Sequence, residues 1–368
     1  MIDELKLSEE IAKIEQVYAE LESDRALALS LAPYPTALNM NNLSPSLPSD
    51  KIAKVNNSID ESKEKFDLLK QTKTPIVVDY WPSWSSNWTR DDLRNTPDSV
   101  SVINIAFALP DGRGSLTWKD DIHPACTKQV ITELQKRNKI VLLSVGGATA
   151  QNWNLSKIDL PTFAKNIKSM IDNYGLNGVD IDYEQPTDRD ILTQLIKELR
   201  KIMPIGKYWI SYAAWSIGAY GIKGHEHPEW DNNHTKGMDI PVLSKIGDLL
   251  DWVNVMSYDA FDPSIRPPYN PTQAIAAFKD LLGNRPDKVL LGILIGKHSW
   301  PQNVLTTTKQ VEGWMDYTIK QKYRGFMFWM LQKDTHQETG ELTGSFTKMT
   351  ERLITKPNHS SNSNLSKS

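Results

Sequence analysis

Three acidic residues alternate with apolar residues in the segment 177–184, at Asp180, Asp182 and Glu184. In a β-strand, side chains two residues apart point to the same face and lie about 6–7 Å apart. One face of such a strand would therefore carry only carboxylates, and the other would be apolar. Neighbouring carboxylates raise one another's pKa, and burial raises it further, so the last acid of the row is suited to protonate a leaving oxygen.

The residues around this segment predict that the strand is buried. Gly178 precedes the acids, Pro186 follows them, and a helical pattern of apolar residues then runs over 188–202. A strand that leads directly into a helix belongs to a β/α unit, whose strands are covered on both faces. The alternative, a surface strand whose acids face water, fits this context less well. Buried acids need partners or a chemical role.

From Thr74 onward, short apolar runs rich in β-branched residues recur and alternate with helical patterns. This alternation predicts a (β/α)8 TIM barrel. The competing fold is a doubly wound open sheet, but residues 79–84 lack the glycine-rich phosphate turn that usually follows its first strand. The predicted strands are Ile76–Tyr80, Val100–Ala108, Lys139–Ser144, Gly178–Glu184, Tyr208–Ala213, Trp252–Ser257, Lys288–Leu294 and Gly325–Met330. The predicted helices are Pro124–Arg137, Leu160–Tyr174, Asp188–Ile202, Pro271–Leu282 and Thr308–Lys322.

The first part of the chain has a different character. Residues 1–73 predict a helical extension of two amphipathic helices joined by a proline-rich linker. These helices would either cap the barrel or bind another chain. We expect the barrel domain to span 74–355 and the serine- and asparagine-rich tail, 356–368, to be disordered.

Composition limits the partners. The formal charge of −3 and the pI near 6.2 favour neither nucleic acid nor an anionic membrane as a partner. Cys126 is the single cysteine, which excludes an intrachain disulfide and argues against a cysteine-based metal site. Twelve tryptophans favour a carbohydrate ligand, although tryptophan also packs cores.

Neither a membrane span nor a secretory signal is evident. The sequence has no run of 18 apolar residues, and its N-terminus lacks the basic and apolar regions of a signal peptide. The compartment is left open, because the chain is cytosolic, is exported by another route, or begins after a removed segment.

The acidic segment resembles the D-G-x-D-x-D-x-E signature of glycoside hydrolase family 18, the chitinases and endo-β-N-acetylglucosaminidases. Two further motifs of that family occur in the same order, S-x-G-G at residues 144–147 and M-x-Y-D at residues 256–259. The chain departs from the usual pattern at Asn177 and Gln185, which changes no catalytic group but leaves the exact substrate open.

The resemblance implies a substrate-assisted, retaining hydrolysis without a cofactor or metal. Glu184 would protonate the leaving sugar and then activate water, while the substrate's acetamido oxygen attacks the anomeric carbon. Asp182 would orient the acetamido N–H, and Asp180 would share a proton with it. Tyr258 would bind the acetamido oxygen, and Asp259 would bind sugar hydroxyls.

The resemblance also indicates the residues that bind the sugar. Trp329 would form the floor of the −1 subsite, and small residues after the third strand would keep space beside the acids. The expected substrate-binding residues beyond the acids are Trp329, Asp259, Met256, Ser144, Gly146 and Gly147, with Tyr80, Phe107, Tyr212 and Trp215 as weaker candidates for subsite walls. Trp81, Trp84 and Trp88 are candidates for the outer cleft.

The expected substrate is a β-1,4-linked N-acetylglucosamine polysaccharide, with an N-glycan core as the alternative. A lectin that binds without cutting is less consistent with the intact Glu184. Only about 30 residues separate the last two strands, which leaves no room for the insertion that deepens many chitinase grooves and predicts an endo-acting enzyme. His225 and His227 lack a third ligand for a metal and are expected at the cleft rim.

Overall fold

A computed structural model describes residues 75–84, 87, 89–119, 122–150, 153–262, 264–299 and 304–355. The predicted N-terminal helices, their linker, the C-terminal tail and Trp88 lie outside these residues. The boundaries of the helical extension and the tail therefore stay predictions.

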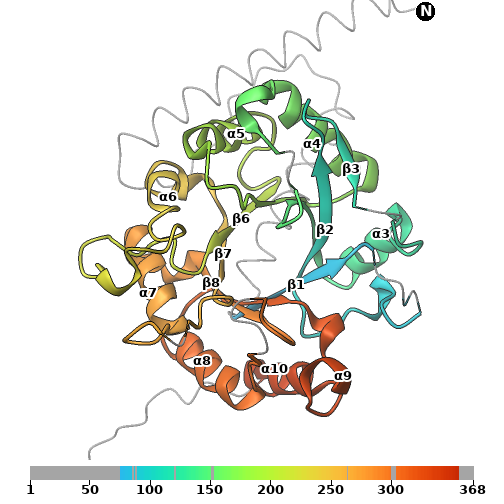
Figure 1. Ribbon diagram of the computed structural model, residues 1–368. Helices are drawn as coiled ribbons and strands as arrows, with labels where there is room; N and C mark the ends of the chain where they lie inside the picture. Colours follow the sequence, from blue (N-terminus) through green and yellow to red (C-terminus); the bar gives the residue numbers. More distant parts are fainter. Residues whose placement is uncertain are drawn as a thin grey trace, which may run out of the picture. The chain divides into compact units, whose positions relative to one another are not determined.

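Within the described residues, eight parallel strands close a barrel (Figure 1). Closure requires that the first strand pair with both its neighbour in sequence and the last strand. β1 does so, because it pairs with β2 and with β9. The strands are β1 Ile76–Pro82, β2 Val102–Pro110, β4 Ile140–Gly146, β5 Gly178–Asp182, β6 Trp209–Trp215, β7 Trp252–Met256, β8 Val289–Leu294 and β9 Gly325–Trp329. The predicted barrel is thus confirmed and the open sheet is excluded.

The helices lie around the outside of the strands (Figure 1). All five predicted helices are present: α3 Lys128–Lys136, α4 Leu160–Tyr174, α5 Arg189–Ile202, α7 Pro271–Leu281 and α8 Thr308–Lys320. Among the strands and α-helices of the described residues, four were not predicted: the antiparallel strand β3 Leu116–Trp118, and the helices α6 Ile240–Ile246, α9 His336–Thr339 and α10 Ser345–Thr355. Two of the unpredicted helices, α6 and α9, are short, whereas α10 is as long as α7 and buries Phe346, Met349 and Leu353 on one face.

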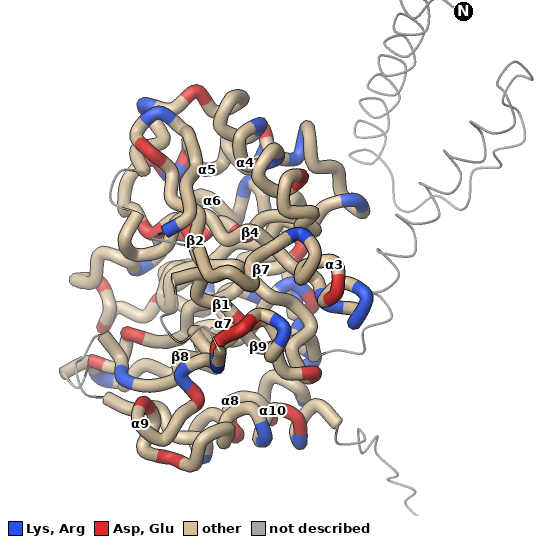
Figure 2. Tube along the Cα trace, turned by 90° about the vertical axis from the view of Figure 1, so that its right-hand side faces the viewer, with Lys and Arg blue, Asp and Glu red and all other residues tan. Residues whose placement is uncertain are grey.

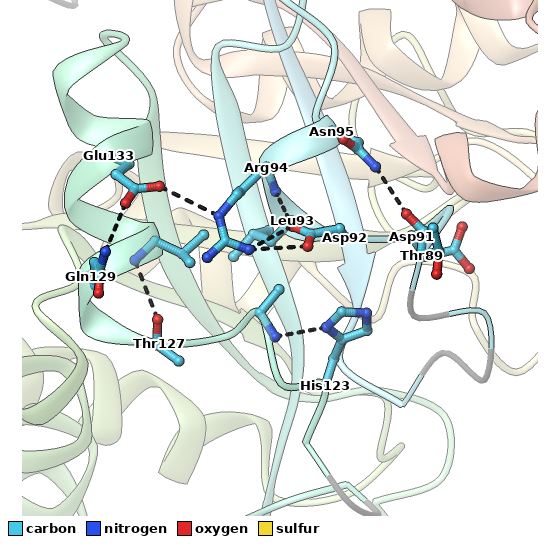
Figure 3. Close-up of polar contacts among 12 residues, drawn as sticks. Thr89, Asp91, Asp92, Leu93, Arg94, Asn95, His123, Thr127, Gln129 and Glu133 are labelled. Atoms are coloured by element: carbon cyan, nitrogen blue, oxygen red, sulfur yellow. Dashed lines mark hydrogen bonds and ion pairs between the residues drawn. The ribbon is translucent and has the colours of Figure 1, made fainter.

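Local sequence explains where the helices begin and end. The side chain of Asp159 accepts a hydrogen bond from Thr162 N at the start of α4, and Gly175 ends this helix in the left-handed conformation. At the start of α3, the side chain of Thr127 accepts from Val130 N, which Figure 3 shows. Such caps satisfy backbone groups that have no partner within the helix.

Alternation along the strands separates two apolar clusters. The outward residues of β5, among them Val179 and Ile181, pack in the large cluster that also contains the buried faces of the helices. A smaller cluster fills the barrel interior with inward residues such as Val78, Leu142 and Met327. Asp180 and Asp182 also point inward, because they alternate with the outward residues.

Charged residues of both signs lie along the helices and loops, whereas the strands labelled in Figure 2 are largely uncharged. None of the helices in the described part of the chain is long and apolar enough to cross a lipid bilayer.

Candidate active site

Strand register fixes the environment of Asp180. Ser144 on β4 and Ser211 on β6 are its register partners, so all three side chains point into the barrel at one level. Both hydroxyls donate to the carboxylate, at 2.8 Å from Ser144 and 2.6 Å from Ser211. Tyr80 and Asn254 donate to it as well, at 2.8 and 3.1 Å. Asp180 is fully buried; burial raises its pKa, and these four bonds oppose the rise.

Asp182 lies one step closer to the end of β5 and has a different environment. Its Oδ1 is buried and has no hydrogen-bond partner among the described residues. Burial, followed by the charges of Glu184 and Asp180, raises its pKa well above the ordinary value. No hydrogen bond joins it to Asp180 in this part of the chain, since the oxygens of Asp180 face the four donors above. A free acceptor in a buried site can take an N–H from a bound molecule.

Glu184 follows the end of β5 and lines a cavity of about 610 Å³ together with Met256, Tyr258, Asp259 and Trp215. Burial, followed by the charge of Asp259, raises the pKa of Glu184 to about 7. A carboxyl group with this pKa holds a proton near neutral pH and can donate it. The structure thus brings together Glu184 and the M-x-Y-D segment after β7. The pKa of Tyr258 is also raised well above its ordinary value, chiefly by burial.

Gly146 and Gly147 let the backbone come close to the acids. A Cβ on Gly146 would lie 2.2 Å from the carbonyl oxygen of Asp182, and one on Gly147 would lie 2.6 Å from the Phe107 ring. Both glycines have positive φ, and Gly147 N donates to the same Asp182 carbonyl at 2.9 Å. Any side chain here would displace either Asp182 or the aromatic wall.

Aromatic rings form one side of the barrel mouth. Trp329 at the end of β9 is stacked with Phe107, with ring centroids 5.6 Å apart, and meets the edge of Tyr80 at 5.9 Å. Trp84 is stacked with Phe107 as well, and the centroids of these two rings are 5.9 Å apart. Tyr80 also bonds Asp180, so this wall is continuous with the acids. Trp81 points outward instead, into the large outer cluster.

The prediction that Tyr212 lines the cleft is wrong. Tyr212 is an outward residue of β6 in the outer cluster, and its hydroxyl lies 2.6 Å from Oδ1 of Asp239 and 2.7 Å from Nη1 of Arg189. Trp215, three residues later, faces the cavity. Alternation along a strand excludes that both residues face inward.

The loop after β6 lines the cavity with Glu229, Asn232 and Thr235. His225 and His227 do not line it. The ring of His225 bonds Asp280 at 2.9 Å, and that of His227 bonds Glu229 at the same distance. The described residues contain no group of three or more side chains placed to hold a metal. The loop thus reaches the rim, but through residues other than the two histidines.

Sequence reasoning missed two donors to Asp180. Ser211 and Asn254 are the polar residues at inward positions of β6 and β7. A polar residue at an inward position of an otherwise apolar strand is the signal that identifies them.

Comparison with known protein families shows which family the chain belongs to. The model of glycosyl hydrolases family 18 matches residues 76–306 of the chain. The chain belongs to glycosyl hydrolase family 18. The matched residues include the row of acids that begins on β5 and the M-x-Y-D segment after β7.

Individual relatives of this family 18 protein are chitinases. The chain is 36% identical over 116 residues to Chitinase Chi52 of Paenibacillus xylanexedens, which covers 31% of this chain and 22% of the relative. It is 28% identical over 204 residues to Chitinase 1 of Aphanocladium album, covering 48% of this chain and 45% of the relative. The chain thus spans less than half the length of these relatives.

A solved structure has the same fold. A chitinase of family 18 from Pseudoalteromonas aurantia superposes with a TM-score of 0.58 at 22% identity, over 76% of this chain and 99% of that one. At this identity the likeness supports the barrel and not a particular substrate.

Proposed function

We propose that this family 18 protein is an endo-acting chitinase that hydrolyses β-1,4-linked N-acetylglucosamine with retention of configuration. The observation that carries the proposal is the unpartnered, buried Oδ1 of Asp182 in the described part of the chain, which lies between the anchored Asp180 and the proton-holding Glu184. An acceptor in this position suits the N–H of a substrate acetamido group.

The nucleophile comes from the substrate. Asp180 accepts four hydrogen bonds at the base of the site, so it has no oxygen free to attack a sugar. Asp259 is also held, because its Oδ1 accepts from Ser299 N at 2.8 Å. In the substrate-assisted mechanism that the resemblance to family 18 implies, the acetamido oxygen attacks the anomeric carbon, with Asp182 orienting the N–H and Tyr258 binding the oxygen.

Glu184 moves the proton in both steps. In the first step it protonates the glycosidic oxygen, the bond from that oxygen to the anomeric carbon breaks, and an oxazolinium ion forms. In the second step the Glu184 carboxylate takes a proton from water, which attacks the same carbon and opens the oxazolinium ring. Two displacements at one carbon retain its configuration. Trp329 would form the floor beneath the reacting sugar.

The connection between β8 and β9 supports endo action. Its described residues contain a single β-bridge, Lys297 with Leu305, and the helix α8. No inserted domain is present among these residues, which agrees with the proposed endo action.

The test is hydrolysis of chitin oligomers by the purified protein and by Glu184→Gln. We expect the wild type to release internal fragments with retained configuration, and the variant to bind the oligomers without cleaving them. Cello-oligosaccharides lack the acetamido group and serve as the control that no enzyme form should cut. Cleavage of a high-mannose glycoprotein alone would assign an N-glycan core as the substrate, and full activity of Glu184→Gln would overturn the mechanism.

A further inference from the structure

A buried histidine outside the three motifs contacts Asp259, which lies beside Glu184. His298 lies after β8 and is 3% exposed. Its Nδ1 accepts a hydrogen bond from Asp259 N at 3.1 Å and lies 3.3 Å from Asp259 Oδ1. Its Nε2 lies 2.7 Å from Thr306 Oγ1. Because Nδ1 accepts the backbone N–H, the proton of a neutral imidazole is on Nε2 and is donated to Thr306.

Asp259 needs this support because of its backbone. Its φ is +52°, in the left-handed region that costs a residue other than glycine about 1 kcal/mol or more. The imidazole satisfies its N–H, and Ser299 N, next to the histidine, donates to its carboxylate at 2.8 Å. The edge-to-face contact of Phe261 with the imidazole, at 5.2 Å, fixes the ring plane.

We propose that His298 is a positioning residue of the active site, which holds Asp259 in its left-handed conformation and so directs the Asp259 carboxylate into the cavity beside Glu184. This inference rests on the proposed role of Glu184 as the acid. Three ionisable groups interact electrostatically with Glu184: Asp182 on β5, and Tyr258 and Asp259 after β7. Of these, Asp259 is the one that His298 contacts.

The experiment compares the pH dependence of kcat/KM for chitin oligomers in the wild type and in His298→Phe, which keeps the ring shape and removes the acceptor. We expect kcat/KM to fall about tenfold. The decrease of kcat/KM at high pH, its basic limb, should move to lower pH, because a misdirected Asp259 no longer favours the protonated form of Glu184. His298→Asn keeps an acceptor and should restore most of the lost activity.

A double-mutant cycle separates positioning from general stability. In an Asp259→Asn background, His298→Phe should move the basic limb no further, since the residue through which it acts has lost its charge. An equal shift in both backgrounds would overturn the proposal, as would a His298→Phe protein that loses thermal stability without any shift. If His298→Phe does not fold, Thr306→Val tests the same positioning by removing the partner of Nε2, and an unchanged limb there also overturns it.

His123 provides the matched control. It is another buried histidine, 2% exposed, whose Nδ1 accepts a backbone N–H, that of Ala125, at 2.9 Å (Figure 3). Its ring meets the edge of Trp81, which faces the outer cluster. His123→Phe should lower the thermal stability and leave the basic limb in place. Activity in Glu184→Gln would contradict the proposed function itself, whereas an inactive Glu184→Gln with an unshifted His298→Phe contradicts only the positioning role.

Discussion

The hydroxyl of Tyr80 on β1 donates to Oδ2 of Asp180 on β5 at 2.8 Å, across the interior of the barrel. The two residues are far apart in sequence and lie on strands that are not neighbours. The bond therefore connects the aromatic wall around Trp329 to the row of acids.

Removal of this bond should affect both stability and catalysis. A hydrogen bond to a buried carboxylate contributes about 1.5–3 kcal/mol, so Tyr80→Phe should lower the free energy of unfolding by about 2 kcal/mol. It should also lower kcat several-fold, because Asp180 then accepts three donors instead of four. Denaturant unfolding and steady-state kinetics measure the two effects. Tyr212→Phe is the matched control on the outer face. It should destabilise the protein, because it removes the hydrogen bond to Asp239, and leave kcat unchanged.

The pH dependence follows from Glu184. Its pKa is raised to about 7, and the proposed mechanism requires the protonated form, so kcat/KM should fall as the pH rises through about 7. Asp259→Asn removes a negative charge that favours the proton, which should move this limb to lower pH. The profile of kcat/KM against pH for both proteins is the measurement. A limb unaffected by Asp259→Asn would show that burial alone sets the pKa.

Asp79 should make the fold less stable as the pH rises. It is fully buried on the outer side of β1, and burial raises its pKa from 3.8 to about 6 against hydrogen bonds from Leu331 N and Gln332. A carboxyl group whose pKa is raised on folding contributes most below its unfolded pKa and loses that contribution as the pH rises through its folded pKa. The loss between pH 4 and pH 7 is about 2 kcal/mol.

Asp79→Asn should remove this part of the pH dependence and be the more stable protein at pH 7. The amide can still accept from Leu331 N, and once the Gln332 side-chain amide turns over, it can donate to Oε1 at the position from which Nε2 donates to Asp79 Oδ2. Thermal unfolding at several pH values tests this. Asp251→Asn should instead destabilise the protein at pH 7, because Asp251 is paired with Arg200 at 2.6 Å.

Two glycine substitutions should have opposite effects. Gly146→Ala places a methyl group against the Asp182 carbonyl at a φ of +115°, so we expect a loss of more than about 3 kcal/mol or failure to fold. Gly313 lies in α8, where an added Cβ would meet no atom within 4 Å, so Gly313→Ala should stabilise the protein by about 0.5–1 kcal/mol. Denaturant midpoints compare the two, and a stable Gly146→Ala protein would contradict the tight packing at the acids.

The sequence alone determined the barrel and the inward row of acids. Both follow from local alternation, because side chains two residues apart on a strand share a face whatever lies around them. The same rule, applied to β6, would have separated Tyr212 from Trp215. The eight barrel strands and five of the helices were predicted because burial on defined faces leaves a period in the sequence.

Only the tertiary structure decided which groups hold these acids. Ser144, Ser211 and Asn254 reach Asp180 because strand register and barrel closure bring three other strands to one level. His298 reaches Asp259 from a segment after β8 that carries no periodic pattern. Such contacts depend on register and on side-chain conformations set by many distant residues at once, so a local pattern can mark an inward polar residue but not the group that it contacts.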